Sequence, residues 1–180
     1  PELQRDKIRN ARHIANPGCF ATCIQLGLLP LAAKKLLKGN VYINAITGST
    51  GAGVKPTAKT HFSWRSGNIS IYKAFHHQHV PEIKQSICQL DPQFSGNIEF
   101  LPYRGDFPRG IFATEMIYLD ITQQEIDDIY TDFYSDSPFT HYVTNEIDMK
   151  QVVNTNKCLV HAKRIDDKIL ITSCIDNLLK

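Results

Sequence analysis

The sequence lacks the marks of membrane and nucleic-acid proteins. It has no apolar run near the roughly 18 residues that a spanning helix needs, and no secretory signal at its start. Its 20 basic and 18 acidic side chains leave a formal charge of +2, without the basic stripe of a nucleic-acid binder. We therefore expect a cytoplasmic protein whose partners include neither a membrane nor a nucleic acid.

The cysteines also lack the spacing that is typical of disulfide-bonded or zinc-binding proteins. The five cysteines are odd in number and none forms a CxxC pair, so neither a disulfide framework nor a zinc site is predicted. The simplest interpretation is reduced thiols in a cytosolic protein, with no metal. These residues are Cys19, Cys23, Cys88, Cys158 and Cys174.

A nucleotide-binding fingerprint is missing as well. No GxGxxG follows a predicted strand, so the sequence encodes no dinucleotide-binding fold. The length of 180 residues with 42% hydrophobic residues fits one globular domain, residues 1–180. Because the chain begins at Pro1 rather than at methionine, we expect it to be a piece of a longer protein.

The periodicity of the remaining sequence predicts an α+β fold. Helices are expected at 19–38, 81–90 and 122–135, with Pro30 kinking or splitting the first of them. A capping box at Thr122 and Glu125 opens the third. Strands are expected at 41–46, 69–75, 98–101, 111–121, 159–165 and 168–175. Late strands with short connections favour a mixed, largely antiparallel sheet with helices on one face.

Cys19 is the first candidate for chemistry. It follows the turn signal Asn16-Pro17-Gly18 and opens an apolar helix. Unpaired N–H groups and a partial positive charge at a helix N-terminus favour the thiolate that a nucleophile requires. The alternative, a small buried filler, is equally supported by the placement alone. Filler is the better interpretation for the other four cysteines.

Two histidines could serve such a nucleophile. His77 and His79 lie two apart at the end of a predicted strand, which would point their side chains the same way. Histidine exchanges protons near neutral pH, and a cysteine nucleophile usually needs such a neighbour. Solvated loop histidines are the competing interpretation. A metal site lacks a third ligand at recognisable spacing.

A glycine-rich loop and an arginine are candidates for holding an anion. The loop 47–53 departs from a P-loop because Val54 precedes Lys55 and a proline follows. Its serial backbone N–H groups could still form an anion-binding nest, although a plain tight loop is the simpler interpretation. Arg109, before a glycine and a strand, could grip a carboxylate or phosphate, or form a surface ion pair. The Arg-Gly-Asp triplet at 104–106 is treated as a chance match.

Taken together, these segments resemble one enzyme family. The stretches NPGCFAT (16–22), TGSTGAG (47–53), HQHVPEI (77–83), PRGI (108–111) and DNLLK (176–180) occur in the order and spacing of N-acetyl-γ-glutamyl-phosphate reductases. The resemblance covers essentially the whole chain. Each motif is modest evidence, but the ordered set is specific.

The resemblance implies a two-domain enzyme of which this chain is one part. In that family an N-terminal Rossmann domain binds NADP, and a C-terminal domain carries catalysis and subunit contacts. Residues 1–180 would be that catalytic and dimerisation domain, with the Rossmann domain absent from this chain. The implied fold is like the C-terminal domain of glyceraldehyde-3-phosphate dehydrogenase-type enzymes, in a homodimer or homotetramer.

It also implies roles for individual residues. Cys19 would attack an acyl phosphate, expel phosphate and form a thioester, which NADPH reduces to an aldehyde. His79, at the family's H-x-P-E position, would transfer protons, with His77 in reserve. Substrate contacts would come from Ser49, Gly51, Gly53, His77 and Arg109. The nicotinamide end of NADP would lie near Pro17, Gly18 and Asn177, and no metal is implied.

Some features depart from the family or leave alternatives open. Val54 stands where the family often has arginine, so the residue that would bind the anionic group of the substrate is unassigned. Phe20 replaces a common tyrosine. Nothing in the sequence distinguishes an N-acetyl from an N-succinyl substrate. The alternatives are an aspartate-semialdehyde dehydrogenase-like reductase, a cofactor-free Cys–His acyl hydrolase, and a non-catalytic oligomerisation module.

Overall fold

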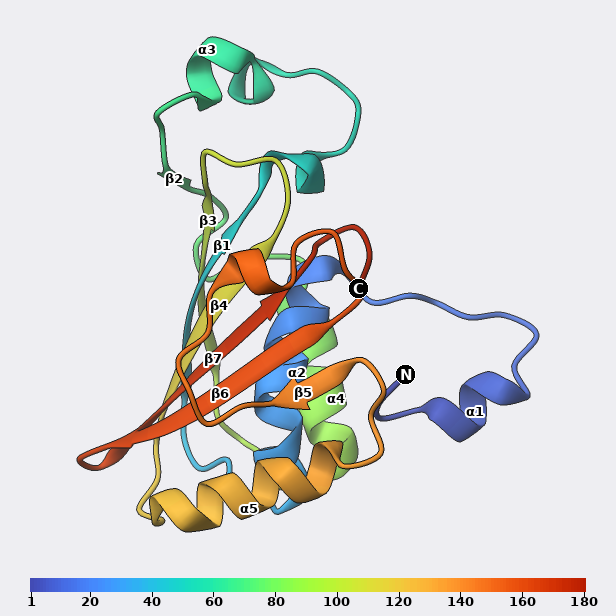
Figure 1. Ribbon diagram of the computed structural model, residues 1–180, viewed down its shortest axis with the longest axis vertical. Coiled ribbons are helices and arrows are strands. Elements are labelled where there is room, and N and C mark those ends of the chain that lie inside the picture. The colour runs from blue at the N-terminus through green and yellow to red at the C-terminus, as the bar shows by residue number, and fades with distance from the viewer.

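A seven-stranded mixed sheet forms the centre of the protein, whose computed structural model describes residues 1–180 (Figure 1). The strand order is β2-β3-β1-β4-β7-β6-β5. Pairs β1–β3 and β5–β6 are parallel and the other four are antiparallel, which confirms the predicted fold class. The strands are β1 (Val41–Thr47), β2 (Ser70–Ile71), β3 (Ile98–Arg104), β4 (Ile111–Tyr118), β5 (Thr140–Tyr142), β6 (Cys158–Ile165) and β7 (Lys168–Ile175).

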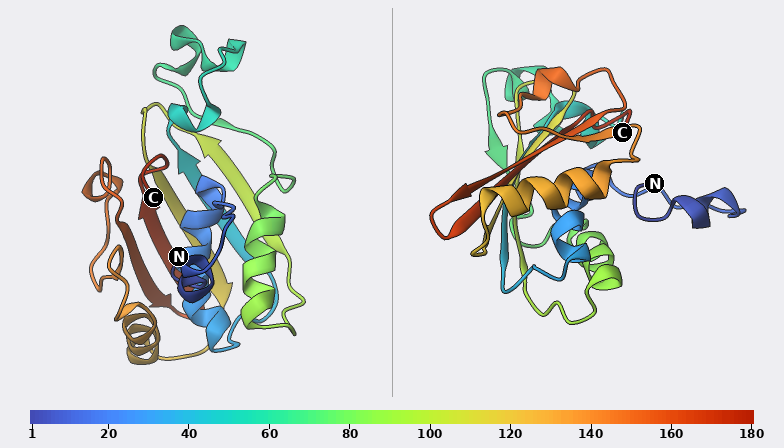
Figure 2. Two further views of the ribbon diagram at one scale, coloured as in Figure 1. Left: turned by 90° about the vertical axis from the view of Figure 1, so that its right-hand side faces the viewer. Right: turned by 60° about the horizontal axis from the view of Figure 1, so that its bottom comes forward.

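The long helices gather on one face of the sheet (Figure 2). Helix α2 (Cys19–Ala33) lies between α4 (Val80–Leu90) and α5 (Gln123–Tyr134), and it is buried along most of its length. The predicted capping box of α5 is confirmed, with reciprocal bonds between Thr122 and Glu125. No helix has the length and apolar character needed to cross a bilayer. The shorter elements are α1 (Arg5–Arg9), α3 (Phe62–Arg65), η1 (Ser49–Ala52), η2 (Ala58–Thr60) and η3 (Met149–Gln151).

Helix α2 is continuous through Pro30, so the predicted split does not occur, and it ends at Ala33 rather than near residue 38. Proline removes the N–H that would bond to the carbonyl four residues earlier, which here is that of Leu26. The hydroxyl of Tyr134 on α5 donates to that Leu26 carbonyl instead. A tertiary hydrogen bond therefore replaces the lost helical one.

The predicted strand 69–75 is reduced to the two residues of β2. The chain leaves the extended conformation at Lys73 and Phe75, whose φ angles are 47° and 61°. A left-handed backbone conformation cannot continue the hydrogen-bonded ladder of a strand, so the alternation of side chains between the two faces of the sheet ends there. The resulting turn carries residues 73–79 toward the N-terminus of α2.

One carboxyl group lies inside the apolar core. Glu115 on β4 is fully buried; its Oε1 accepts from the Ser173 hydroxyl at 3.2 Å, and its Oε2 has no partner. A Cβ on Gly27 of α2 would lie 2.0 Å from Oε2, so only glycine fits beneath this carboxyl. Burial raises the pKa of Glu115 well above its ordinary value, which favours the neutral form of the carboxyl.

We expect Glu115→Gln to stabilise the protein, and by more at pH 8 than at pH 5. The unfolded carboxyl ionises near 4.5 while the folded one keeps its proton, so wild-type stability falls as pH rises above that value. An uncharged amide of similar shape removes this loss. Thermal midpoints at both pH values measure the effect, with half-buried Glu99→Gln on β3 as the control. An equal gain at both pH values would contradict the assignment.

Candidate active site

A pocket of about 230 Å³ lies where the N-terminus of α2 meets the carboxyl ends of β1 and β3 and the turn before α4. Parallel pairing of β1 with β3 brings both carboxyl ends to one edge, with Thr47 opposite Arg104. The pocket brings together five of the predicted site residues from three separate segments: Cys19, Ser49, Gly51, His77 and His79.

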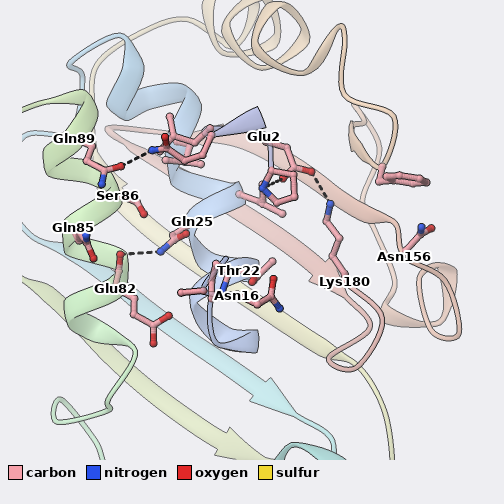
Figure 3. A pocket seen from close by; sticks show the side chains of 18 of the residues that line it. Glu2, Asn16, Thr22, Gln25, Glu82, Gln85, Ser86, Gln89, Asn156 and Lys180 are labelled. Carbon is pink, nitrogen blue, oxygen red and sulfur yellow. Dashed lines mark hydrogen bonds and ion pairs between the residues drawn. The ribbon is translucent and has the colours of Figure 1, made fainter. Parts of the chain in front are cut away.

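The other predicted residues do not line this pocket. Gly53 ends η1 at a positive φ of 77°, where a Cβ would meet no neighbour. Pro17 is exposed and borders a larger groove of about 910 Å³ (Figure 3). Glu82, which Figure 3 labels, also borders that groove, and its carboxylate accepts from the Gly18 N–H at 2.9 Å. Glu82 thus connects the groove to the turn that precedes Cys19.

Cys19 is the first residue of α2, with Gly18 as its N-cap, and it is half-buried. Burial raises the pKa of the Cys19 thiol, the N–H groups of Phe20 and Cys19 itself oppose this, and the charge of Glu82 adds to it. The N–H groups at the helix N-terminus thus favour the thiolate as expected, but the net shift of the Cys19 pKa is upward. Desolvation of the sulfur outweighs the helix terminus.

We expect Cys19 in this chain to be alkylated slowly at neutral pH. Because only the thiolate reacts, the rate should rise about tenfold per pH unit between pH 7 and 9. The measurement is iodoacetamide labelling followed by peptide mass spectrometry. Buried Cys23 and Cys158 serve as internal controls that stay unmodified while the protein is folded. A rate for Cys19 that is already maximal at pH 7 would contradict the raised pKa.

His79 lies in the same pocket as Cys19, against the residue that precedes it. Its ring packs on the Cα of Gly18, where a Cβ would fall 2.1 Å from Nε2. Glu82 Oε1 is 4.0 Å from Nε2, and Nδ1 is buried without a partner. Burial lowers the pKa of His79, opposed by the charge of Glu82. The ring is mostly neutral at pH 7, and because Nδ1 is buried, Nε2 is the nitrogen that could exchange a proton with a ligand in the pocket.

His77 occupies an aromatic cluster. Its ring makes edge contacts with Phe20, Tyr72 and Phe100 at centroid distances of 5.4–5.6 Å. Its Nδ1 accepts from the His79 N–H, and burial lowers its pKa to about 4. The two rings lie 4.6 Å apart because of a tight turn before α4, not because of strand alternation. The His77 ring is thus held by packing and by this hydrogen bond to the His79 backbone.

The glycine-rich loop is held by a second loop. The N–H groups of Gly48, Ser49 and Thr50 donate to carbonyls of Gly110, Phe107 and Pro108 respectively. A Cβ on Gly48 would lie 2.6 Å from the Pro108 carbonyl oxygen, so glycine is required there. These three amides are not free to form an anion nest. The loop instead presents Ser49 to the pocket.

Arg109 and Asn177 act within the chain rather than at the pocket wall. The Arg109 guanidinium donates to the buried carboxylate of Asp176 at 3.0 Å. The Asn177 amide accepts from the Gly110 N–H at 2.7 Å and donates to the Thr50 hydroxyl at 3.0 Å. Both residues therefore fasten the loop pair that carries Ser49.

The pocket residues that were not predicted from the sequence include Tyr72, Lys73 and Arg104. The guanidinium carbon of Arg104 lies 3.6 Å from the centre of the Tyr72 ring, and the Lys73 ammonium donates to Gln78 at 2.7 Å. The available signal was position, since Arg104 ends a strand that lies parallel to β1.

The fold and pocket define a class of protein: an α+β domain that places a cysteine beside a neutral histidine, as enzymes with covalent acyl intermediates do. Residues 19–177 match the family model of the semialdehyde dehydrogenase dimerisation domain, and the chain belongs to this family.

Relatives agree in sequence and in fold. The chain is 63% identical to an N-acetyl-gamma-glutamyl-phosphate reductase of Bacteroides thetaiotaomicron and 52% identical to one of Flavobacterium johnsoniae, in each case over all 180 residues. It spans 56% and 55% of their lengths. Aspartate semialdehyde dehydrogenase II from Vibrio cholerae superposes with a TM-score of 0.70 at 13% identity, covering 98% of this chain and 62% of that one. This last likeness shows the fold.

Proposed function

We propose that residues 1–180 form the catalytic and dimerisation domain of an NADPH-dependent N-acetyl-γ-glutamyl-phosphate reductase. This enzyme makes N-acetyl-glutamate semialdehyde and phosphate in arginine biosynthesis, in the cytoplasm and as a homodimer or homotetramer. The observation that supports the proposal most is the pairing of Cys19 with His79 in one pocket, in a chain 63% identical to a reductase of that name.

The residues of this chain would carry out the acyl transfer. His79 accepts the Cys19 proton, which overcomes the raised pKa of the thiol, and the sulfur attacks the acyl carbon. The C–O bond to phosphate breaks, phosphate leaves with the bonding electrons, and a thioester remains on Cys19. After reduction, His79 holds the proton that neutralises the developing alkoxide, and collapse of that adduct releases the aldehyde and the cysteine.

The cofactor is NADP, held mainly by a nucleotide-binding domain outside this chain. When bound, it supplies the hydride that reduces the thioester. Of the residues predicted to contact it, Pro17 is exposed along the groove of Figure 3. Gly18 lies under His79, and the Asn177 amide already bonds Gly110 and Thr50. Of the three residues, Pro17 and the backbone of Gly18 are therefore the ones that could contact the nicotinamide.

The test is turnover by the full-length protein. We expect N-acetyl-glutamate semialdehyde to drive NADPH formation only when inorganic phosphate is present. Aspartate semialdehyde in its place tests the related reductase, and ester hydrolysis without nucleotide tests the Cys–His hydrolase. Faster turnover in either of those assays would overturn the proposal.

A further inference from the structure

Two cationic side chains in the pocket have no acidic partner. Arg104 and Lys73 border the same space as Cys19 and His79, and no aspartate or glutamate lines it. The backbone of Arg104 pairs within the sheet, but its side chain makes no hydrogen bond or ion pair with any residue of the chain, so the N–H donors of its guanidinium remain free for a ligand. A pocket lined by two cations and no carboxylate favours a negatively charged ligand.

The fold holds Arg104 in place without using those donors. Alternation along β3 puts Arg104 on the same face as Phe100, whose ring touches Phe20 and His77 of the site. The guanidinium stacks on the ring of Tyr72 at 3.6 Å, which fixes its plane and leaves its edge open. Tyr72 is itself fixed by its N–H, which donates to the Pro102 carbonyl at 3.1 Å.

The turn that supplies the second cation is strained. Lys73 has a φ of 47°, a conformation that non-glycine residues seldom adopt, and its ammonium is tethered to Gln78 at 2.7 Å. Strain of this kind concentrates where a side chain must be delivered to a functional site. The pocket therefore offers two kinds of cation: the planar guanidinium of Arg104 and the compact ammonium of Lys73.

We propose that Arg104 is a specificity-determining residue that binds a carboxylate of the substrate away from the reacting acyl phosphate. The inference rests on the proposed function, whose substrate carries two anionic groups. A guanidinium fork matches the two oxygens of a carboxylate, whereas the Lys73 ammonium suits a phosphate as a point charge. The carboxylate can be that of the amino-acid backbone, or a second one on a dicarboxylic N-acyl group.

The kinetic test compares Arg104→Leu with wild type in the full-length enzyme, running the reaction from the semialdehyde. Three substrates are used: the N-acetyl compound, its α-carboxamide, and the N-succinyl compound. We expect Arg104→Leu to raise KM about 10- to 100-fold on a substrate that carries the recognised carboxylate, with a smaller change in kcat. Arg104→Lys should recover part of the loss. Arg164→Leu, near the β6–β7 turn, is the matched control.

The pattern of losses identifies the carboxylate. If the loss disappears with the α-carboxamide, Arg104 binds the backbone carboxylate. If the loss is found only with the N-succinyl compound, it binds the acyl carboxylate. An equal loss on all three substrates, or a raised KM for phosphate alone, would overturn the proposal.

An equilibrium measurement separates this inference from the proposed reaction. Calorimetric titration of N-acetyl-L-glutamate into the full-length Cys19→Ser protein requires no turnover. Adding Arg104→Leu should weaken binding about tenfold or more, while N-acetyl-L-glutamate α-amide should bind both proteins alike if the backbone carboxylate is the one recognised. Should the protein prove inactive as a reductase, this titration still decides the role of Arg104. Unchanged affinity for both N-acetyl-L-glutamate and an N-succinyl-L-glutamate probe would refute it.

Discussion

Cys19→Ser should lower the kcat of the full-length reductase by at least about a thousandfold. A serine hydroxyl is far harder to deprotonate than a thiol, and the neutral His79 beside it cannot make up the difference. The oxygen ester that would replace the thioester is also a poorer hydride acceptor. The measurement is phosphate-dependent NADPH formation with N-acetyl-glutamate semialdehyde.

A second Cys→Ser variant controls for loss of activity through misfolding. Cys88 lies on α4, half-buried like Cys19 and outside the pocket, so Cys88→Ser should retain turnover within a few-fold. Both variants should unfold at similar temperatures. Retained turnover in Cys19→Ser would remove the covalent mechanism and leave the oligomerisation module as the better description of the chain.

We expect His79→Asn to lower kcat by about 10²- to 10⁴-fold, the usual contribution of a positioned proton-transfer group. Asparagine keeps a polar side chain beside Gly18 but cannot exchange a proton. In the wild type, neutral imidazole is the active form, so kcat/KM should fall as pH drops through the lowered pKa of His79. This acid limb, below pH 6.5, should vanish in the variant.

The neighbouring histidines separate this role from a structural one. His76 is exposed and outside the pocket, so His76→Asn should leave the pH profile unchanged. His77→Asn disrupts the aromatic cluster, and we expect a lower thermal midpoint with the acid limb intact. If instead His77→Asn removes the acid limb and His79→Asn does not, the two roles are reversed.

Local patterns predicted most elements of the fold. The capping box of Thr122 and Glu125, the β6–β7 hairpin around residues 166–167 and the helix opening at Cys19 all depend on neighbours within a few residues. The errors occurred where distant residues intervene. Pro30 is tolerated because Tyr134, over a hundred residues away, donates to the Leu26 carbonyl.

The candidate site divides in the same way. Local sequence was enough to select the candidates for chemistry: a cysteine after a Pro-Gly turn, a histidine before Val-Pro-Glu, and a glycine loop. The protonation and bonding of these residues follow from tertiary contacts. Burial outweighs the expected pKa shift of Cys19, the 107–110 loop occupies three amides of the glycine loop, and parallel pairing of β1 with β3 delivers Arg104 to the pocket. Desolvation and pairing depend on groups far apart in the chain, which spacing along the sequence does not encode.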